Sequence, residues 1–186
     1  MSMPFSNRQM LGTIALRLQS GRKLVLLHGN ADPDAIGCAF AIYRSFPNVD
    51  VVAPGGLDRL SKVIGSKLDF KIAERPPSED YDVTVILDTS SPDQLGSFDG
   101  PLENCIVIDH HTRTERWPAC TYYCDERKRS CAEIVYELLK ESGVEISREV
   151  GLALLIGMLT DSGHLNYATP TLLRSFAEIL EKTGLN

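Results

Sequence analysis

Short apolar runs, each followed at once by acidic or imidazole side chains, constrain the fold of this chain more than any other feature. The clearest runs cover residues 23–27, 83–87 and 105–108. They are short for helices and lack polar alternation, which is typical of strands buried on both faces of a parallel sheet. Because the carboxyl ends of such strands share one edge, the polar residues that follow them converge in space. We therefore predict an α/β fold with a functional site at that edge.

The remaining segments complete this architecture as a mostly parallel sheet of about five strands with helices on both faces. Two further strands are expected at 49–53 and around 70–72, whereas residues 112–125 are predicted to be irregular. Capping residues and apolar periodicity indicate the helices. We expect them between Ser6 and Gly21, at 34–44, at 57–64, after Ser130 with a capping box completed by Glu133, at 148–159, and at 171–182. The whole chain, residues 1–186, is expected to form a single domain.

Composition argues against several classes of protein. The net charge of −6 speaks against a broad basic surface for duplex nucleic acid. No apolar run approaches the roughly 20 residues of a membrane span, and the first residues lack a signal-peptide pattern, so we expect a cytoplasmic protein without membrane contact. The five cysteines are expected to be reduced, structural thiols. A zinc site at Cys120 and Cys124 is a less favoured alternative.

The acidic segments point to a metal site. Carboxylates gathered in one place repel one another and lose hydration, and divalent cations remove both costs. Three of the four histidines lie in the same segments as the carboxylates. Taken singly, each of these residues has a structural alternative, because an aspartate can cap a helix and a histidine after a strand can be a hydrogen-bonded core residue. Their coincidence at the ends of strands and helices favours the metal site.

Taken together, these segments resemble the four motifs of the DHH phosphoesterase superfamily, which is named for the triplet found here at residues 109–111. The first motif is similar to residues 28–37, the second to 88–90 and the fourth to 157–163. Ser130-Cys-Ala-Glu133 also resembles a segment of the branch that contains the nanoRNases and the 3′-phosphoadenosine-5′-phosphate phosphatases. The resemblance runs along nearly the whole chain.

The resemblance implies two metal ions with divided ligands. The implied ligands are His28 and Asp32 for one ion; Asp34, His110 and Asp161 for the other; and Asp88 as a bridge between them. This division assigns Asp32 and Asp34, which are only two residues apart, to different ions. Mixed carboxylate and imidazole ligands suit Mn²⁺, with Mg²⁺ or Co²⁺ as alternatives.

The same resemblance implies catalytic roles for three residues. Asp88 would hold the pair of ions, which activate a hydroxide for attack at phosphorus. His111 would face the substrate phosphate, and Asp109 would orient an imidazole by accepting its other N–H. Substrate contacts are assigned to Asn30, Arg113, Arg116 and His164, although a solvated loop for the arginines and a surface position for His164 are the alternatives. The basic run at 127–129 has two interpretations, a guide for a nucleic-acid backbone and, more commonly, a solvated turn.

The predicted function is a divalent-metal-dependent phosphoesterase or phosphodiesterase that hydrolyses short nucleotides, such as short oligoribonucleotides or 3′-phosphoadenosine-5′-phosphate. Members of this branch usually carry a second, C-terminal substrate-binding domain, and nothing in this sequence resembles it. We therefore expect a catalytic domain that stands alone, is a fragment, or completes its site in a homodimer. The alternatives are a manganese-dependent inorganic pyrophosphatase and a non-catalytic nucleotide-binding module that lacks its partner domain.

Overall fold

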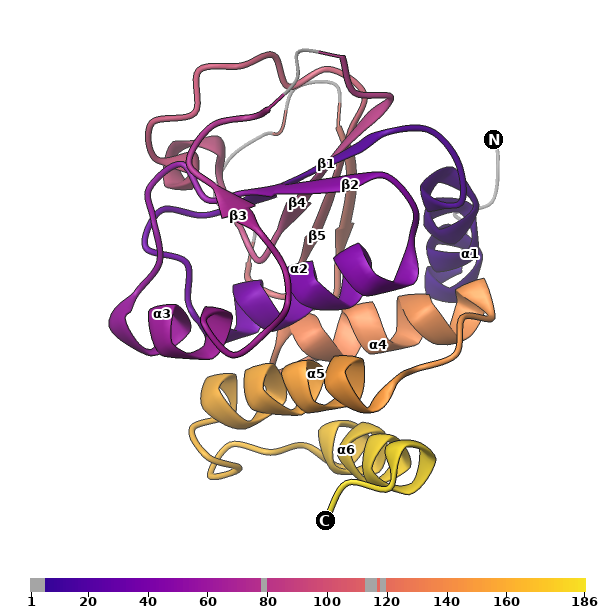
Figure 1. Ribbon diagram of the computed structural model, residues 1–186. Helices are drawn as coiled ribbons and strands as arrows, with labels where there is room; N and C mark the ends of the chain where they lie inside the picture. The colour runs from indigo at the N-terminus through magenta and orange to yellow at the C-terminus, as the bar shows by residue number, and fades with distance from the viewer. Residues whose placement is uncertain (1–5, 78–79, 113–116, 118–119) are drawn as a thin grey trace.

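A computed structural model describes residues 6–77, 80–112, 117 and 120–186. Its centre is a sheet of six strands in the order β3-β2-β1-β4-β5-β6, with parallel pairing throughout (Figure 1). The strands are β1 Lys23–Leu27, β2 Val49–Val52, β3 Ile72–Ala73, β4 Val83–Leu87, β5 Cys105–Asp109 and β6 Thr121–Cys124. The α/β fold and the parallel sheet predicted from the apolar runs are confirmed.

The sixth strand, β6, lies in the stretch that was predicted to be irregular. It pairs with β5 along Ile106↔Thr121 to Asp109↔Cys124, at the edge of the sheet. Most of its residues are only half-buried, so its sequence mixes polar and apolar residues and lacks the continuous apolar run of β1, β4 and β5. The prediction of irregular structure there was wrong because a half-covered edge strand gives a weak sequence signal.

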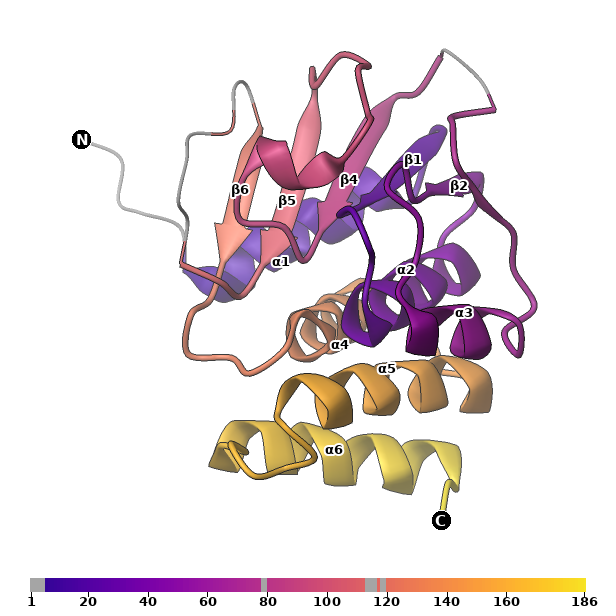
Figure 2. The same cartoon turned by 90° about the vertical axis from the view of Figure 1, so that its left-hand side faces the viewer.

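Helices cover the two faces of the sheet unequally. The α-helices are α1 Asn7–Leu18, α2 Pro33–Ser45, α3 Arg59–Gly65, α4 Cys131–Ser142, α5 Arg148–Asp161 and α6 Pro170–Thr183. The main core joins α1, α2 and α4 to one face of the strands, and α5 and α6 form further layers outside α2 and α4 (Figure 2). The other face carries the short 3₁₀ helix η1 (Pro92–Leu95) and loops, which pack around Leu95 and Trp117. Among the described residues, η1 is the only helix on that second face, where longer helices were expected.

Most helices begin where the sequence indicated. Ser6, Ser130 and Ser147 cap α1, α4 and α5 with their hydroxyl groups. The capping box expected at Ser130 is only half formed, since the Glu133 carboxylate accepts from the N–H of Arg129 (2.7 Å), one residue before the cap. In the described part of the chain, no helix is long and apolar enough to cross a membrane.

Two of the five cysteines are not free thiols. Cys105 and Cys120 form a disulfide, which contradicts the expectation that all five are reduced. The cause is the unpredicted strand β6: Cys105 begins β5, Cys120 directly precedes β6, and the pairing of these strands brings the two Cα atoms to 4.5 Å. Cys38, Cys124 and Cys131 are free, and the disulfide removes Cys120 from any zinc site.

Candidate metal centre

The site lies where the central strands end. The chain runs from β1 outward through β2 and β3 and then returns to β4 beside β1, so the order of the sheet reverses between β1 and β4. Ligands bind in the crevice at such a switch point, beyond the carboxyl ends of the strands. His28 directly follows β1, Asp88 follows β4, and Asp109 ends β5. The pairing of Leu27 with Leu87 and of Leu87 with Ile108 brings these strand ends level with one another.

One group of potential ligands contains His28, Asp32 and Asp88. The Nε2 atom of His28 lies 3.9 Å from Oδ1 of Asp32 and 3.9 Å from Oδ2 of Asp88. Asp32 is the N-cap of α2, and its Oδ1 accepts from the N–H groups of Asp34 and Ala35, both at 3.0 Å. The carboxylate is therefore fixed by the start of the helix, and one ligand atom from each of the three residues lies within 4.8 Å of the others.

A second group contains Asp34, His110 and Asp161. The Nε2 atom of His110 lies 2.9 Å from Oδ2 of Asp161, which is the last residue of α5. Asp34 is fully buried in the first turn of α2. These three residues also place their ligand atoms within 4.8 Å of one another.

Asp88 joins the two groups. Its Oδ2 faces His28, as described above, and its Oδ1 lies 3.4 Å from Nε2 of His110. The side chain is only 2% exposed, and the backbone has φ +55°, in the left-handed region that aspartate tolerates better than most residues. Local strain of this kind is concentrated at functional sites. The two oxygens of one carboxylate thus face one histidine from each group. Oδ1 also lies 3.6 Å from Nδ1 of His111, and Asp88, His110 and His111 form a third set of potential ligands.

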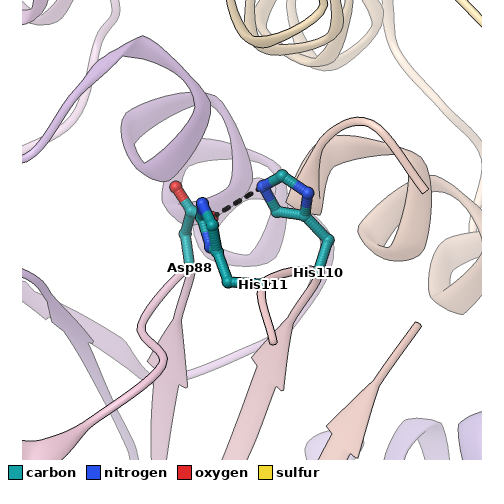
Figure 3. Close-up of side chains that lie close together, drawn as sticks. All are labelled: Asp88, His110 and His111. Carbon is teal, nitrogen blue, oxygen red and sulfur yellow. Dashed lines mark ion pairs between the residues drawn. The ribbon is translucent and has the colours of Figure 1, made fainter. Parts of the chain in front are cut away.

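Asp109 lies behind the two histidines that follow it. Its Oδ1 accepts from the backbone N–H groups of His110 (2.8 Å) and His111 (3.2 Å), and it lies 2.9 Å from the ring Nδ1 of His111. Its Oδ2 accepts from the hydroxyl of Tyr122 at 3.2 Å. Figure 3 shows His110 and His111 following β5 and pointing toward Asp88. The bond to Asp109 uses Nδ1 of His111, so the Nε2 of that half-exposed ring remains for another partner.

Electrostatics in the cluster follow from this crowding. Burial, and then the negative charges of Asp88 and Asp161, hold the pKa of Asp34 well above its ordinary value. Burial alone would lower the pKa of His110, but the carboxylates of Asp161 and Asp88 overcome it and raise that pKa to about 11. Asp34 thus resists ionisation, while His110 beside it retains its proton. Both shifts indicate a site with an excess of negative charge.

The residues of this cluster fit a divalent-metal site. Oδ1 of Asp88 is buried and makes no hydrogen bond with any described residue. The buried Nε2 of His110 lies 2.9 Å from Oδ2 of Asp161 and 3.4 Å from Oδ1 of Asp88, but neither contact has hydrogen-bond geometry. Buried polar atoms are normally satisfied, and unpaired ones call for a specific explanation such as an ion. Carboxylate oxygens and imidazole nitrogens are donors that Mn²⁺ and related ions accept. The two ligand groups, linked through Asp88, would hold one cation each.

Comparison with known proteins identifies the family. The model of the DHH family, N-terminal domain, matches residues 22–158. The chain belongs to the DHH family. An uncharacterized protein of Methanocaldococcus jannaschii is 36% identical over 162 residues, which cover 81% of this chain and 48% of that protein. The bifunctional oligoribonuclease and PAP phosphatase NrnA of Thermus thermophilus is 28% identical over 172 residues, covering 89% of this chain and 51% of NrnA.

Other relatives extend the comparison. A probable manganese-dependent inorganic pyrophosphatase of Streptococcus mutans is 30% identical over 148 residues, which cover 75% of this chain and 47% of that protein. A solved exopolyphosphatase-related protein of Bacteroides fragilis superposes with a TM-score of 0.78 at 21% identity, covering 95% of this chain and 57% of the other, which shows the shared fold. The chain spans about half the length of the curated relatives it matches.

The six predicted DHH metal ligands all lie in the two groups, and Asp32 and Asp34 fall in different ones. Asp32 is the cap outside α2, whereas Asp34 lies inside its first turn, so the start of the helix turns the two carboxylates apart.

The predicted substrate contacts are not brought together in the same way. Asn30 is exposed in the loop after β1, with φ +58° and its N–H bonded to the carbonyl of Gly55. His164 is exposed in the turn after α5, and its ring makes no hydrogen bond or ion pair with any described residue. Arg113 and Arg116 lie outside the described residues.

Sequence reasoning missed the residues that hold Asp34 from behind. The backbone N–H groups of Cys131 and Ala132, at the start of α4, donate to its carboxylate, and a Cβ on Gly157 would lie 2.5 Å from its Oδ1. The available signal was the Ser130-Cys-Ala-Glu133 segment, which predicted a helix start but gave no indication of what that helix start contacts.

Proposed function

We propose that this DHH chain is a divalent-metal-dependent phosphoesterase or phosphodiesterase that acts on short nucleotides. The observation that carries the proposal is the carboxylate of Asp88, whose two oxygens face the His28 group and the His110 group. A carboxylate shared by two cations would hold them close together, as two-metal phosphoryl chemistry needs. When bound, paired divalent cations activate water and stabilise charge on the attacking and leaving oxygens.

The chain's own residues have complementary tasks in this proposal. Asp34, Asp161 and Asp88 supply the negative charge, and burial of Asp34 and Asp88 keeps bulk water from screening it. Asp109 accepts a hydrogen bond from Nδ1–H of His111, which leaves Nε2 of that half-exposed ring for another partner. We assign this exposed nitrogen to a phosphoryl oxygen of the substrate. The hydroxyl of Tyr122 donates a hydrogen bond to the other oxygen of Asp109 and so helps to fix the orientation of this carboxylate.

The proposal of a nucleotide substrate is supported by sequence similarity to a relative. NrnA of Thermus thermophilus is named as an oligoribonuclease and PAP phosphatase, and we extend that substrate class, short oligoribonucleotides and 3′-phosphoadenosine-5′-phosphate, to this chain. Asn30, Arg113, Arg116 and His164 stay predicted substrate contacts. The single-domain boundary, the cytoplasmic location, the homodimer and the role of a C-terminal substrate-binding domain also stay predictions.

A manganese-dependent inorganic pyrophosphatase is the second candidate, because the probable pyrophosphatase of Streptococcus mutans is among the relatives. A third is a nucleotide-binding module without turnover. The three candidates differ in what they release: nucleotides or phosphate from nucleotides, phosphate from pyrophosphate, or no product.

The test is a product assay on the full chain with Mn²⁺, Mg²⁺ or Co²⁺, using a dinucleotide, 3′-phosphoadenosine-5′-phosphate and pyrophosphate in parallel. We expect turnover of at least one of the two nucleotide substrates and its loss in Asp88→Asn, which removes the bridging charge while keeping a residue that tolerates positive φ. Asp69→Asn, at an exposed aspartate that precedes β3 and belongs to none of the ligand groups, is the matched control and should retain activity. Release of phosphate from pyrophosphate alone would favour the second candidate, and nucleotide binding without product would favour the third.

A further inference from the structure

The segment Ser130-Cys-Ala-Glu133 starts α4, and the function proposed above assigns it no task. Ser130 caps the helix by accepting the N–H of Glu133 at 3.2 Å. The N–H groups of the next two residues donate hydrogen bonds outside the helix, to a residue almost a hundred positions earlier in the chain. Cys131 donates to Oδ2 of Asp34 at 2.6 Å, and Ala132 donates to Oδ1 at 3.0 Å.

The start of a helix is well suited to hold this carboxylate. Its first N–H groups have no partner within the helix and carry the positive end of the helix dipole. Asp34, Cys131 and Ala132 are all fully buried, so water does not compete for these bonds. The cap on Ser130 matters here because it fixes the first turn in which the two donors stand side by side.

Other contacts close the remaining directions. The thiol of Cys38 lies 3.8 Å from Oδ1 of Asp34, and Gly157 leaves no room on that side for a side chain. A carboxylate offers about four acceptor positions. The acceptor positions that the two N–H groups and the thiol do not use remain for a ligand shared with His110 and Asp161. The ligand atoms of these two residues and of Asp34 lie within 4.8 Å of one another.

We infer that the N–H groups of Cys131 and Ala132 are positioning groups that aim Asp34 at the cation of the His110 group. The inference rests on the proposed metal site and adds to it the reason for a helix start at residue 130. The peptide groups act through Asp34 and touch neither cation nor substrate. Loss of one donor should therefore weaken one cation site and spare the other, which is built by His28, Asp32 and Asp88.

Proline at position 131 removes the donor with little other change to the backbone. Proline is favoured at the first position of a helix, and Ser130 has φ −160° and ψ 153°, the extended conformation that a residue before proline prefers. The ring carbon that replaces the hydrogen would occupy the place of the hydrogen bond, so the carboxylate must turn as well as lose its donor. Cys131→Ala is the matched control, because it removes the same thiol and keeps the N–H.

The experiment is a titration of each full-length, metal-free variant with Mn²⁺ alone, with the free ion followed by electron paramagnetic resonance. We expect two bound ions in the wild type and in Cys131→Ala. In Cys131→Pro, one of the two dissociation constants should rise by about 10- to 100-fold, the usual effect of removing a group that orients a ligand. Two unchanged constants in a folded Cys131→Pro protein would overturn the inference. No Mn²⁺ binding by the wild type would instead overturn the proposed function.

Folding is checked separately by circular dichroism in the presence of a chelator. If Cys131→Pro does not fold, Ala132→Pro removes the second donor, again within the first turn, where proline is tolerated. A measurement on the wild type needs no variant: the amide resonances of Cys131 and Ala132 should shift as Mg²⁺ is added in a heteronuclear NMR titration. Resonances that stay in place at saturating Mg²⁺ would also overturn the inference.

Discussion

Replacement of Gly157 by alanine should damage the site and the fold together. A Cβ at this position would lie 2.5 Å from Oδ1 of Asp34, 3.1 Å from its Cα and 3.2 Å from Cβ of Ala132. Asp34 has little freedom to retreat, since its carboxylate is fully buried and accepts two backbone N–H groups. The clash must therefore be relieved by a shift of α5 or by rotation of the carboxylate away from its donors.

The magnitude follows from two opposing terms. Overfilling a packed position costs about 1–3 kcal/mol, whereas alanine gains about 1 kcal/mol over glycine in helix propensity. Gly157→Ala should thus be destabilised by a net of about 0–2 kcal/mol. Gly12→Ala, within α1, is the matched control, because no atom lies within 4 Å of its added Cβ. It receives only the propensity gain, so the two variants should differ by about 1–3 kcal/mol.

The assay is thermal unfolding of both variants with a chelator and then with Mn²⁺. For a chain of this size, 1 kcal/mol corresponds to about 2–4 °C, so Gly157→Ala should melt roughly 2–12 °C below Gly12→Ala. Each tenfold loss of Mn²⁺ affinity removes about 1.4 kcal/mol from the stabilisation by the ion. The Mn²⁺-induced rise should therefore be smaller in Gly157→Ala. Equal melting temperatures, with equal rises on adding Mn²⁺, would refute the reasoning.

Three further predictions concern protons, the disulfide and the bridging carboxylate. The pKa of His110 is raised from 6.5 to about 11, so its proton stabilises the metal-free fold fully below pH 6.5 and less as the pH rises toward 11. Mn²⁺ must displace this proton, so the affinity for Mn²⁺ should increase with pH. Calorimetry in two buffers of different ionisation enthalpy should detect the proton release. Cys120→Ser should lower the free energy of unfolding by about 3 kcal/mol, since the disulfide with Cys105 spans 15 residues, whereas Cys124→Ser, at a free thiol, should not; equal denaturant midpoints would contradict this. Asp88→Ala should be less stable than Asp88→Asn by about 1–2 kcal/mol in the metal-free state, because alanine tolerates φ +55° poorly, and urea unfolding with a chelator measures the difference.

The sequence predicted those parts of the molecule in which local pattern and tertiary environment agree. Strands β1, β4 and β5 are buried throughout, so their apolar runs were sufficient evidence. The convergence of the six predicted ligands could be expected because parallel strands bring distant segments to one edge. Asp109 was expected to orient an imidazole; its carboxylate lies 2.9 Å from Nδ1 of His111, and the role stays a prediction.

What could not be predicted depends on contacts between segments that carry no local signature. Edge strand β6 is half-exposed, so its pairing with β5, and with it the Cys105–Cys120 disulfide, left no periodic trace. Backbone donors such as the N–H of Cys131 are present in every residue but proline. Their use by Asp34 becomes visible only when α4 is placed against α2.

The two ligand groups have different foundations. His28 and Asp88 extend directly from neighbouring strands of the sheet, whereas Asp161 sits at the tip of α5, which lies beyond α2. The separation of these helices is set at Gly37, where a Cβ would lie 2.4 Å from the carbonyl oxygen of Ala153. One proposed cation would thus be held by residues that extend from strands and from the start of α2. The other would also depend on the position of α5, so a displacement of α5 would move its ligand Asp161.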